Sequence, residues 1–217
     1  TRRGSWLLIS KGLSGARRSS CAQPTCGDAM KPEGPVARRE DYRVVSIAHA
    51  EGATLIRQYH YARGCSNTGI MHGLFHNEQG LVGVAHWLPP TRVCAESVSP
   101  HWQRVLSLTR LVVLPEQPQN CATMLLGASV RLLRAMKRYA ALVTYADEAQ
   151  GHTGTIYKAS GWEYIGRTGP YPRWLTADGA QVATKSGPKT RTKAEMLALG
   201  HVMVGRFYKH KFVKQLP

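Results

Sequence analysis

The stretch of residues 142–166 constrains the fold of this chain most, because it combines a strand, a sharp turn, a short helix and a second strand in immediate succession. Residues 142–146 are apolar and include Val, Thr and Tyr, which favours a buried strand. Gly151 and Gly154 then allow a tight turn before a helix over about residues 155–160. The pattern predicts a βαβ unit and therefore an α/β protein.

Two adjacent carboxylates, Asp147 and Glu148, stand where the first of these strands stops. Successive side chains of a regular strand point to opposite faces, so only one of the two can enter a site unless the strand end is bulged. We expect Asp147 to be the inward group. The alternative is that both carboxylates cap the following turn. Tyr157, on the short helix, is expected to face back toward this acidic strand end.

Positive charge dominates the composition. The 217 residues include 29 Lys and Arg against 13 Asp and Glu, which gives a net charge of +16 and a pI of about 10.1. This balance favours a polyanionic partner, above all nucleic acid. An anionic membrane surface is the other candidate, but no stretch approaches the roughly 18 apolar residues of a spanning helix. We therefore expect a soluble, intracellular protein that has no membrane partner.

The chain divides by composition into three expected parts. Residues 1–40 are rich in Arg, Ser, Gly and Pro and lack periodicity, which is typical of a disordered basic arm. Residues 41–175 are expected to form the folded domain, and residues 176–217 a basic extension that contacts DNA. The five cysteines are odd in number and scattered, which favours a reducing compartment. Cys21 and Cys26 lack the second ligand pair that structural zinc needs.

Hydrophobic patterning before residue 142 predicts further elements in alternation. The apolar strand over residues 106–114 carries Arg110, which requires an anionic partner if it is buried. Asn120 is expected to be the N-cap of a long helix. The helix before His60 turns that imidazole toward the core. In order, the predicted elements are a strand at 42–47, a helix at 49–59, a hairpin of strands at 69–76 and 81–88, the strand at 106–114 and the helix from residue 120.

This order of elements resembles the GNAT acyltransferase fold, a mixed central sheet flanked by helices. The segment Arg110-Leu-Val-Val-Leu-Pro115 is similar to the fourth strand of that family, and Tyr157-x3-Gly161-Trp162 to its Tyr-x3-Gly-Phe ending. The resemblance implies that Tyr157 is a general acid for a leaving thiolate. The family's glycine-rich phosphate loop is replaced by residues 116–124, which contain no glycine. The residues implied to bind acetyl-CoA or another acyl donor are Val112, Val113, Asn120, Ala122 and Thr123.

Four separated blocks, residues 60–69, 89–97, 108–113 and 145–154, resemble the Mom DNA-modification family. The resemblance implies a GNAT-like enzyme that converts adenine in phage DNA to N6-carbamoylmethyladenine. Its substrate would be double-stranded DNA with a flipped adenine, in the cytoplasm of the infected bacterial host, and the product would resist host restriction. The resemblance also implies iron, for which the candidate ligands are His60, Asp147 and His152.

The expected catalytic groups are His60, Tyr61, Ser107, Arg110, Asp147, Glu148 and Tyr157. A carboxylate here could act as general base for an amine. Arg110 could bind a donor phosphate or pair with Asp147, and Ser107 could orient the substrate. A base that leaves the DNA stack needs an aromatic surface, for which Tyr61, Trp87 and Tyr145 are candidates. Ser66 and Asn67 could contact adenine.

For each of these residues the alternative is a purely structural role. Two other functions also fit the sequence. One is a small-molecule N-acyltransferase that uses acetyl-CoA, and the other is a basic DNA-binding module without catalytic activity.

Overall fold

The computed structural model describes residues 35–186 and 189–217. Most of the basic arm expected at residues 1–40, with Cys21 and Cys26, lies outside these ranges. Residues 35–40 are placed: Ala37 is buried and Arg39–Asp41 forms a 3-10 helix, η1. Residues 35–40, the end of the segment that we expected to be disordered, are therefore ordered in the structure.

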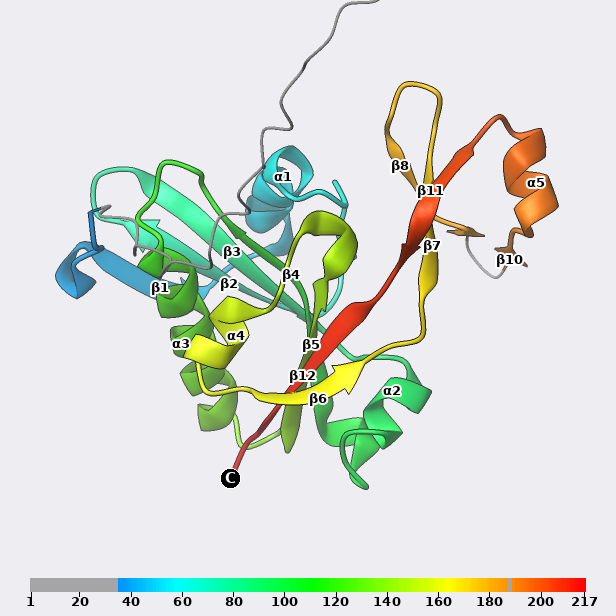
Figure 1. The fold of residues 1–217 in the computed structure, drawn as a ribbon. Coiled ribbons are helices and arrows are strands. Elements are labelled where there is room, and N and C mark those ends of the chain that lie inside the picture. The colour runs from blue at the N-terminus through cyan, green and yellow to red at the C-terminus, as the bar shows by residue number, and fades with distance from the viewer. Residues whose placement is uncertain (1–34, 187–188) are drawn as a thin grey trace, which may run out of the picture. The chain divides into compact units, whose positions relative to one another are not determined.

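A mixed seven-stranded sheet forms the centre of the fold, in the order β1-β2-β3-β4-β5-β12-β6 (Figure 1). Only β4 and β5 pair in parallel within this sheet. The α/β class with a GNAT-like mixed sheet is thus confirmed. The strands are β1 Tyr42–Ser46, β2 Ile70–His76, β3 Gly80–Leu88, β4 Val105–Val113, β5 Ala141–Asp147, β6 Glu163–Arg167 and β12 Lys209–Gln215.

Helices cover both faces of this sheet. The buried residue Ile56 of α1 packs with Val84 and Val112 on one face. Leu125 and Leu126 of α3 pack on the other face, against the residues of β3 and β4 that directly follow Val84 and Val112 in the sequence. Such alternation is expected of strands buried on both sides. The helices around the sheet are α1 His49–Tyr59, α2 Arg92–Glu96, α3 Asn120–Ala135 and α4 Thr155–Ala159, with the 3-10 turns η2 Trp102–Arg104 and η3 Glu148–Gln150.

The strand β12 lies inside the sheet, between β5 and β6. Phe212 at its middle is fully buried. The described residues, 35–186 and 189–217, belong to one compact unit, so the boundary expected near residue 175 is not a boundary of the fold. Residues 176–217 are basic in composition, yet they include the strand β12, in which Lys side chains flank a buried Phe and a buried Val.

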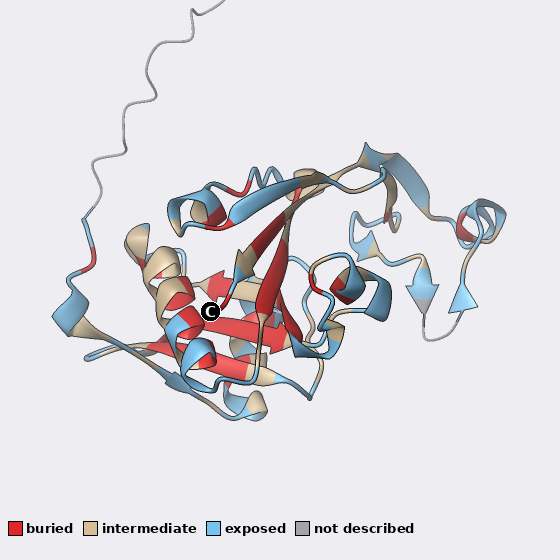
Figure 2. Ribbon diagram, turned by 90° about the horizontal axis from the view of Figure 1, so that it is seen from below, coloured by how far each residue is buried: buried red, intermediate tan, exposed pale blue. Residues whose placement is uncertain are grey.

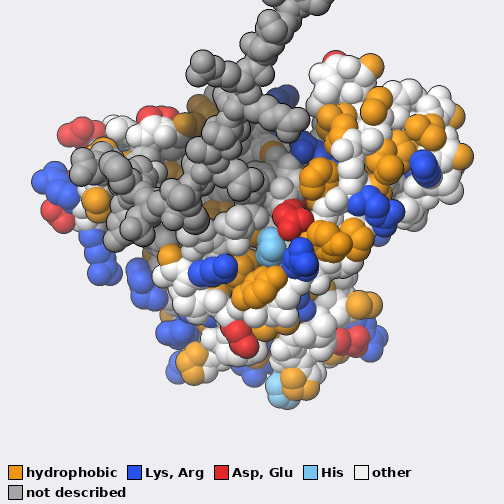
Figure 3. Space-filling view, in the orientation of Figure 1, with side chains coloured by type: hydrophobic (Ala, Val, Ile, Leu, Met, Phe, Trp, Pro, Cys, Tyr) orange, Lys and Arg blue, Asp and Glu red, His pale blue; other side chains and the backbone are white. Residues whose placement is uncertain are grey.

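Residues 168–208, which we call the arm, lead away from the sheet between β6 and β12 (Figure 1). Three of its strands are paired in the order β11-β7-β8, β9 pairs with β10, and the arm is mostly exposed (Figure 2). Hydrophobic side chains such as Leu199 and Val202 gather on its surface, whereas Lys and Arg are spread over the visible face (Figure 3). Its elements are β7 Tyr171–Leu175, β8 Gln181–Val182, β9 Lys185–Ser186, β10 Lys189–Thr190, α5 Lys193–Ala198 and β11 Val202–Phe207.

Among the residues that the structure describes, no helix combines the length and the apolar character that crossing a membrane requires.

Candidate active site

The parallel pair β4 and β5 forks at its carboxyl end. Pairing runs from Val105 with Ala141 to Leu108 with Thr144 and stops there, although β4 continues to Val113 and β5 to Asp147. At the fork, Thr144 Oγ1 donates a hydrogen bond of 3.3 Å to the Leu108 carbonyl. A cavity of about 340 Å³, lined by both strands, opens beyond this point. We call it the fork cavity.

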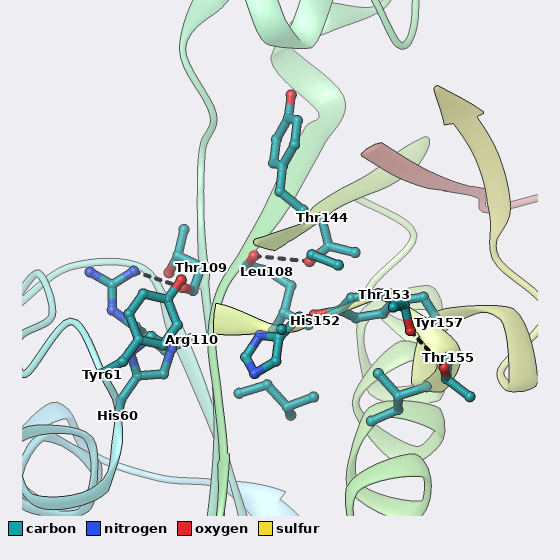
Figure 4. Close-up of a pocket in the computed structure, with 16 residues that line it drawn as sticks. His60, Tyr61, Leu108, Thr109, Arg110, Thr144, His152, Thr153, Thr155 and Tyr157 are labelled. Atoms are coloured by element: carbon teal, nitrogen blue, oxygen red, sulfur yellow. Dashed lines mark hydrogen bonds between the residues drawn. The ribbon is translucent and has the colours of Figure 1, made fainter. Parts of the chain in front are cut away.

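Residues from distant parts of the chain line the fork cavity (Figure 4). His60 and Tyr61, which follow α1, lie with Arg110 on one side, while Thr155 and Tyr157 of α4 lie on the other. His152 stands between the two groups. Of the residues expected in the site, the cavity thus brings together His60, Tyr61, Arg110, Tyr145, His152 and Tyr157.

Arg110 fixes the loop that carries His60 and Tyr61. Its Nε donates 2.8 Å to the Gly64 carbonyl and its Nη1 donates 2.7 Å to the Thr109 carbonyl. Of the two partners expected for Arg110, a donor phosphate or Asp147, the second is not formed: among the described residues Arg110 has no ion pair, and Asp147 contacts Lys209 and Tyr171. Backbone carbonyls take that place, and Arg110 joins the loop after α1 to β4.

Burial and neighbouring positive charge act on His60. Desolvation, followed by the nearby Arg110 and His152, lowers the pKa of His60 from 6.5 to about 4. Its Nδ1 accepts a hydrogen bond of 3.1 Å from the Ala62 amide. The imidazole is therefore neutral near pH 7, and it can accept a proton only at Nδ1, in exchange for the hydrogen bond from the Ala62 amide.

The phenol of Tyr157 remains protonated. Burial raises its pKa, and a hydrogen bond with Thr144 opposes that rise. Burial also raises the pKa of Tyr61, and the charge of Asp147 adds to the effect. The fork cavity thus combines a neutral imidazole, which can accept a proton, with phenols that can donate one.

Asp147 is not among the residues that line the fork cavity, although its charge raises the pKa of Tyr61, which does line it. The Asp147 side chain is only 3% exposed, and its Oδ1 accepts a hydrogen bond of 3.0 Å from the Ala149 amide. Tyr171 of the arm donates to the same oxygen, and Lys209 Nζ lies 3.8 Å from Oδ2. Asp147 therefore caps the turn that follows β5, which was the alternative reading, and anchors the arm to that turn.

Glu148 is also engaged outside the fork cavity. Its Oε2 accepts 3.1 Å from the Tyr208 amide, and its Oε1 lies 3.3 Å from His210 and 3.8 Å from Arg167. These contacts tie η3 to the ends of β6 and β12. The Glu148 carboxylate thus has hydrogen-bond and charged partners within the protein, which gives it a structural role.

Other expected site residues lie away from the fork cavity. Ser107 is buried before the fork, and Trp87 is fully buried with its ring stacked on Trp162 at 6.4 Å. Neither can contact a substrate in the cavity. Ser66 hydrogen-bonds Thr68 at 2.8 Å, and Asn67 is exposed in the same loop.

The side chains expected to bind a coenzyme A donor are engaged within the protein or lie outside the fork cavity. The α3 N-cap is Gln119, and the Asn120 side chain instead bonds both backbone groups of Ala37, at 2.8 and 3.2 Å. Thr123 Oγ1 donates to the Asn120 carbonyl. Neither Ala122 nor the two valines of β4, Val112 and Val113, line the fork cavity.

The expected iron ligands likewise do not fit a metal centre. His60 and His152 share the cavity, but Asp147 faces Tyr171 and Lys209. Within residues 35–186 and 189–217, no three or more His, Cys, Asp or Glu side chains are grouped so as to hold a metal ion. The part of the chain that the structure describes therefore offers no ligand set for the implied iron.

Several residues of the site were not anticipated from the sequence. Thr109, Thr144, Thr153 and Thr155 line the fork cavity, and Tyr171 and Lys209 hold Asp147. The position of Thr144 within a buried apolar run was a usable signal, because a buried hydroxyl needs a partner. Nothing local in the sequence connects Tyr171 with Asp147, since the arm places them together.

The mixed sheet with helices on both faces matches the fold of solved N-acetyltransferases, as the resemblance to the GNAT family implied. The ribosomal-protein-S18-alanine N-acetyltransferase from Escherichia coli superposes with a TM-score of 0.51 at 14% identity, covering 81% of this chain and 94% of that one.

The chain belongs to the Mom protein family, whose match extends over residues 41–215. It is similar to the methylcarbamoylase Mom of Escherichia phage Mu, with 27% identity over 134 residues. That alignment spans 58% of this chain and 54% of the phage protein, so the chain matches about half of its relative.

Proposed function

We propose that this protein is a DNA-modifying transferase that converts adenine to its N6-carbamoylmethyl form. The observation that carries the proposal is the fork cavity, which holds a neutral imidazole and a protonated phenol on opposite sides in a chain of the Mom family. The net charge of +16 supports a nucleic acid as the substrate.

The proposed reaction assigns a different role to each side of the fork cavity. The adenine amine bonds to the transferred carbon, and the bond between that carbon and its leaving group breaks. His60 accepts the proton that the amine loses, and Tyr157 donates a proton to the leaving group. The lowered pKa keeps the His60 imidazole neutral at pH 7 and at the same time makes it a weaker base than an ordinary histidine.

Tyr61 is the proposed surface on which the extruded base stacks. Its ring is 40% exposed at the edge of the fork cavity and lies 6.1 Å from the His152 ring. Extrusion of a base from duplex DNA costs a few kcal/mol, which stacking on an aromatic side chain offsets. Tyr145 is less suited to this role because its hydroxyl is engaged with Cys94 Sγ at 3.0 Å.

Mass spectrometry of nucleosides tests this function. DNA from cells that express the wild-type protein should contain an adenosine heavier by one carbamoylmethyl group. His60→Gln should reduce that product by about 10²- to 10⁴-fold, because it removes the proton acceptor. His76→Gln is the matched control, since His76 lies at the end of β2 outside the fork cavity.

Unmodified adenosine from the wild-type strain would disprove the proposed function and favour a small-molecule N-acyltransferase. Equal product from His60→Gln and wild type would remove His60 from the mechanism but leave the function standing.

A further inference from the structure

A second cavity, of about 580 Å³, lies beside the fork cavity and shares Tyr61 with it. One wall is the loop after α1, with Arg63, and the other is the arm, with Arg173 and the turn between β7 and β8. Gln150 Nε2 donates 3.1 Å to Gln181 Oε1, which links η3 to the arm across this space. We call it the arm cavity.

The arm cavity is lined by two arginines and one acidic residue, Asp178, which is exposed. Arg173 Nη1 donates 2.7 Å to the Ala149 carbonyl, so its guanidinium is held in place. Its Nε is buried and has no hydrogen-bond partner among the described residues. A guanidinium held at the wall of a cavity favours an anionic ligand, and phosphate oxygens suit its geometry.

The backbone of Arg63 is unusual. Its φ of 46° is one of two positive values for residues other than glycine in the described part of the chain, and the other is 53° at Lys137. Such a conformation costs energy in any residue with a Cβ and is free of that cost in glycine. An arginine at this position therefore lowers the stability of the backbone. It also places a cation on the lining of the arm cavity.

We propose that the arm cavity binds a backbone phosphate of the DNA strand whose adenine enters the fork cavity, and that Arg63 and Arg173 contact that phosphate. This inference rests on the proposed function. A base that leaves the stack stays covalently joined to its backbone, so the adjoining phosphate must pass close to the mouth of the base cavity. Tyr61 forms the wall between the two cavities, which places one beside the other.

The two positive-φ positions provide a matched pair of variants, Arg63→Gly and Lys137→Gly. Each change removes one positive charge and relieves the same backbone strain, so neither should lower the melting temperature. Lys137 lies after α3, before β5 begins, whereas the fork is at the far end of β5. The affinity of each variant for a double-stranded oligonucleotide is then measured by fluorescence anisotropy over a range of salt concentrations.

Arg63→Gly should reduce the slope of log affinity against log salt by about 0.9, the value for one lost phosphate contact. Lys137→Gly should keep the wild-type slope, and Arg63→Lys should restore most of it. Equal slopes for Arg63→Gly and Lys137→Gly would overturn the proposal, even if adenine modification fell, because the ligand phosphate would then belong to another molecule such as the donor. If DNA from cells that express the wild-type protein contains no modified adenine, the proposed function itself is refuted.

Discussion

His60 illustrates how far a single side chain depends on its surroundings. The helix pattern predicted that this imidazole turns inward, and the structure places it in the fork cavity. Its lowered pKa comes from burial and from Arg110 and His152, which approach from β4 and from the turn after β5. Sequence spacing cannot reveal that combination, because both partners are distant in the chain.

We expect Arg110→Gln to raise the pKa of His60 from about 4 toward 6.5, since it removes a positive charge beside the ring. NMR titration of the His60 ring protons measures this directly. A His60 pKa that stays near 4 would show that burial and His152 set it without Arg110.

The same shift predicts how stability depends on pH. The unfolded chain binds a proton on His60 at about pH 6.5, whereas the folded chain does so only near pH 4. The folded state therefore loses stability as the pH falls through this interval. The contribution of His60 is fully present above about pH 6.5.

At the scale of elements, local pattern predicted the central elements well. The expected helix at residues 49–59 is α1, and the expected strand at 142–146 lies within β5. Both depend on side-chain periodicity, which a short window contains. Asn120 was wrong as a cap because its side chain bonds Ala37, and residues 168–208 carried no recognisable pattern for the arm.

The turn between β5 and α4 depends on two glycines with different surroundings. Gly151 and Gly154 both have positive φ, of 71° and 79°. A Cβ at Gly154 would collide with the Phe212 ring, whereas a Cβ at Gly151 would meet nothing within 4 Å. A side chain at position 151 would therefore cost only the strain of the positive φ.

We expect Gly154→Ala to lower the free energy of unfolding by about 2 to 4 kcal/mol, from backbone strain and overpacking together. Gly151→Ala should cost about 1 to 2 kcal/mol, from the backbone alone. Urea denaturation of both variants measures the difference. Equal costs would show that Phe212 moves aside freely.

At the scale of the whole molecule, the sheet is completed by β12, a strand that its basic composition disguised. Local rules read residues 209–215 as a charged tail, because its pairing partners lie far away in the chain. The same limit applies to Asp147, whose contacts with Tyr171 and Lys209 depend on the arm and on β12. Sequence analysis placed residues correctly where their neighbours were local.

We expect Phe212→Ala to destabilise the protein by about 3 to 5 kcal/mol, because it empties a fully buried position. Phe207→Ala removes the same ring from β11 of the arm, where the side chain is only partly buried, and should cost distinctly less. Thermal or urea unfolding compares them. A larger loss at Phe207 would mean that the arm, and not the sheet, limits stability.

The place of β12 also sets an order of events during translation. The ribosome delivers β5 and β6 first, then the whole arm, and only afterwards the strand that fits between them. Until residue 215 emerges, β5 and β6 keep unpaired edges, which attract other chains. The nascent protein therefore passes through a stage in which the sheet lacks the strand between β5 and β6. Pairing of β12 with these two strands is a late, long-range step that should be slow.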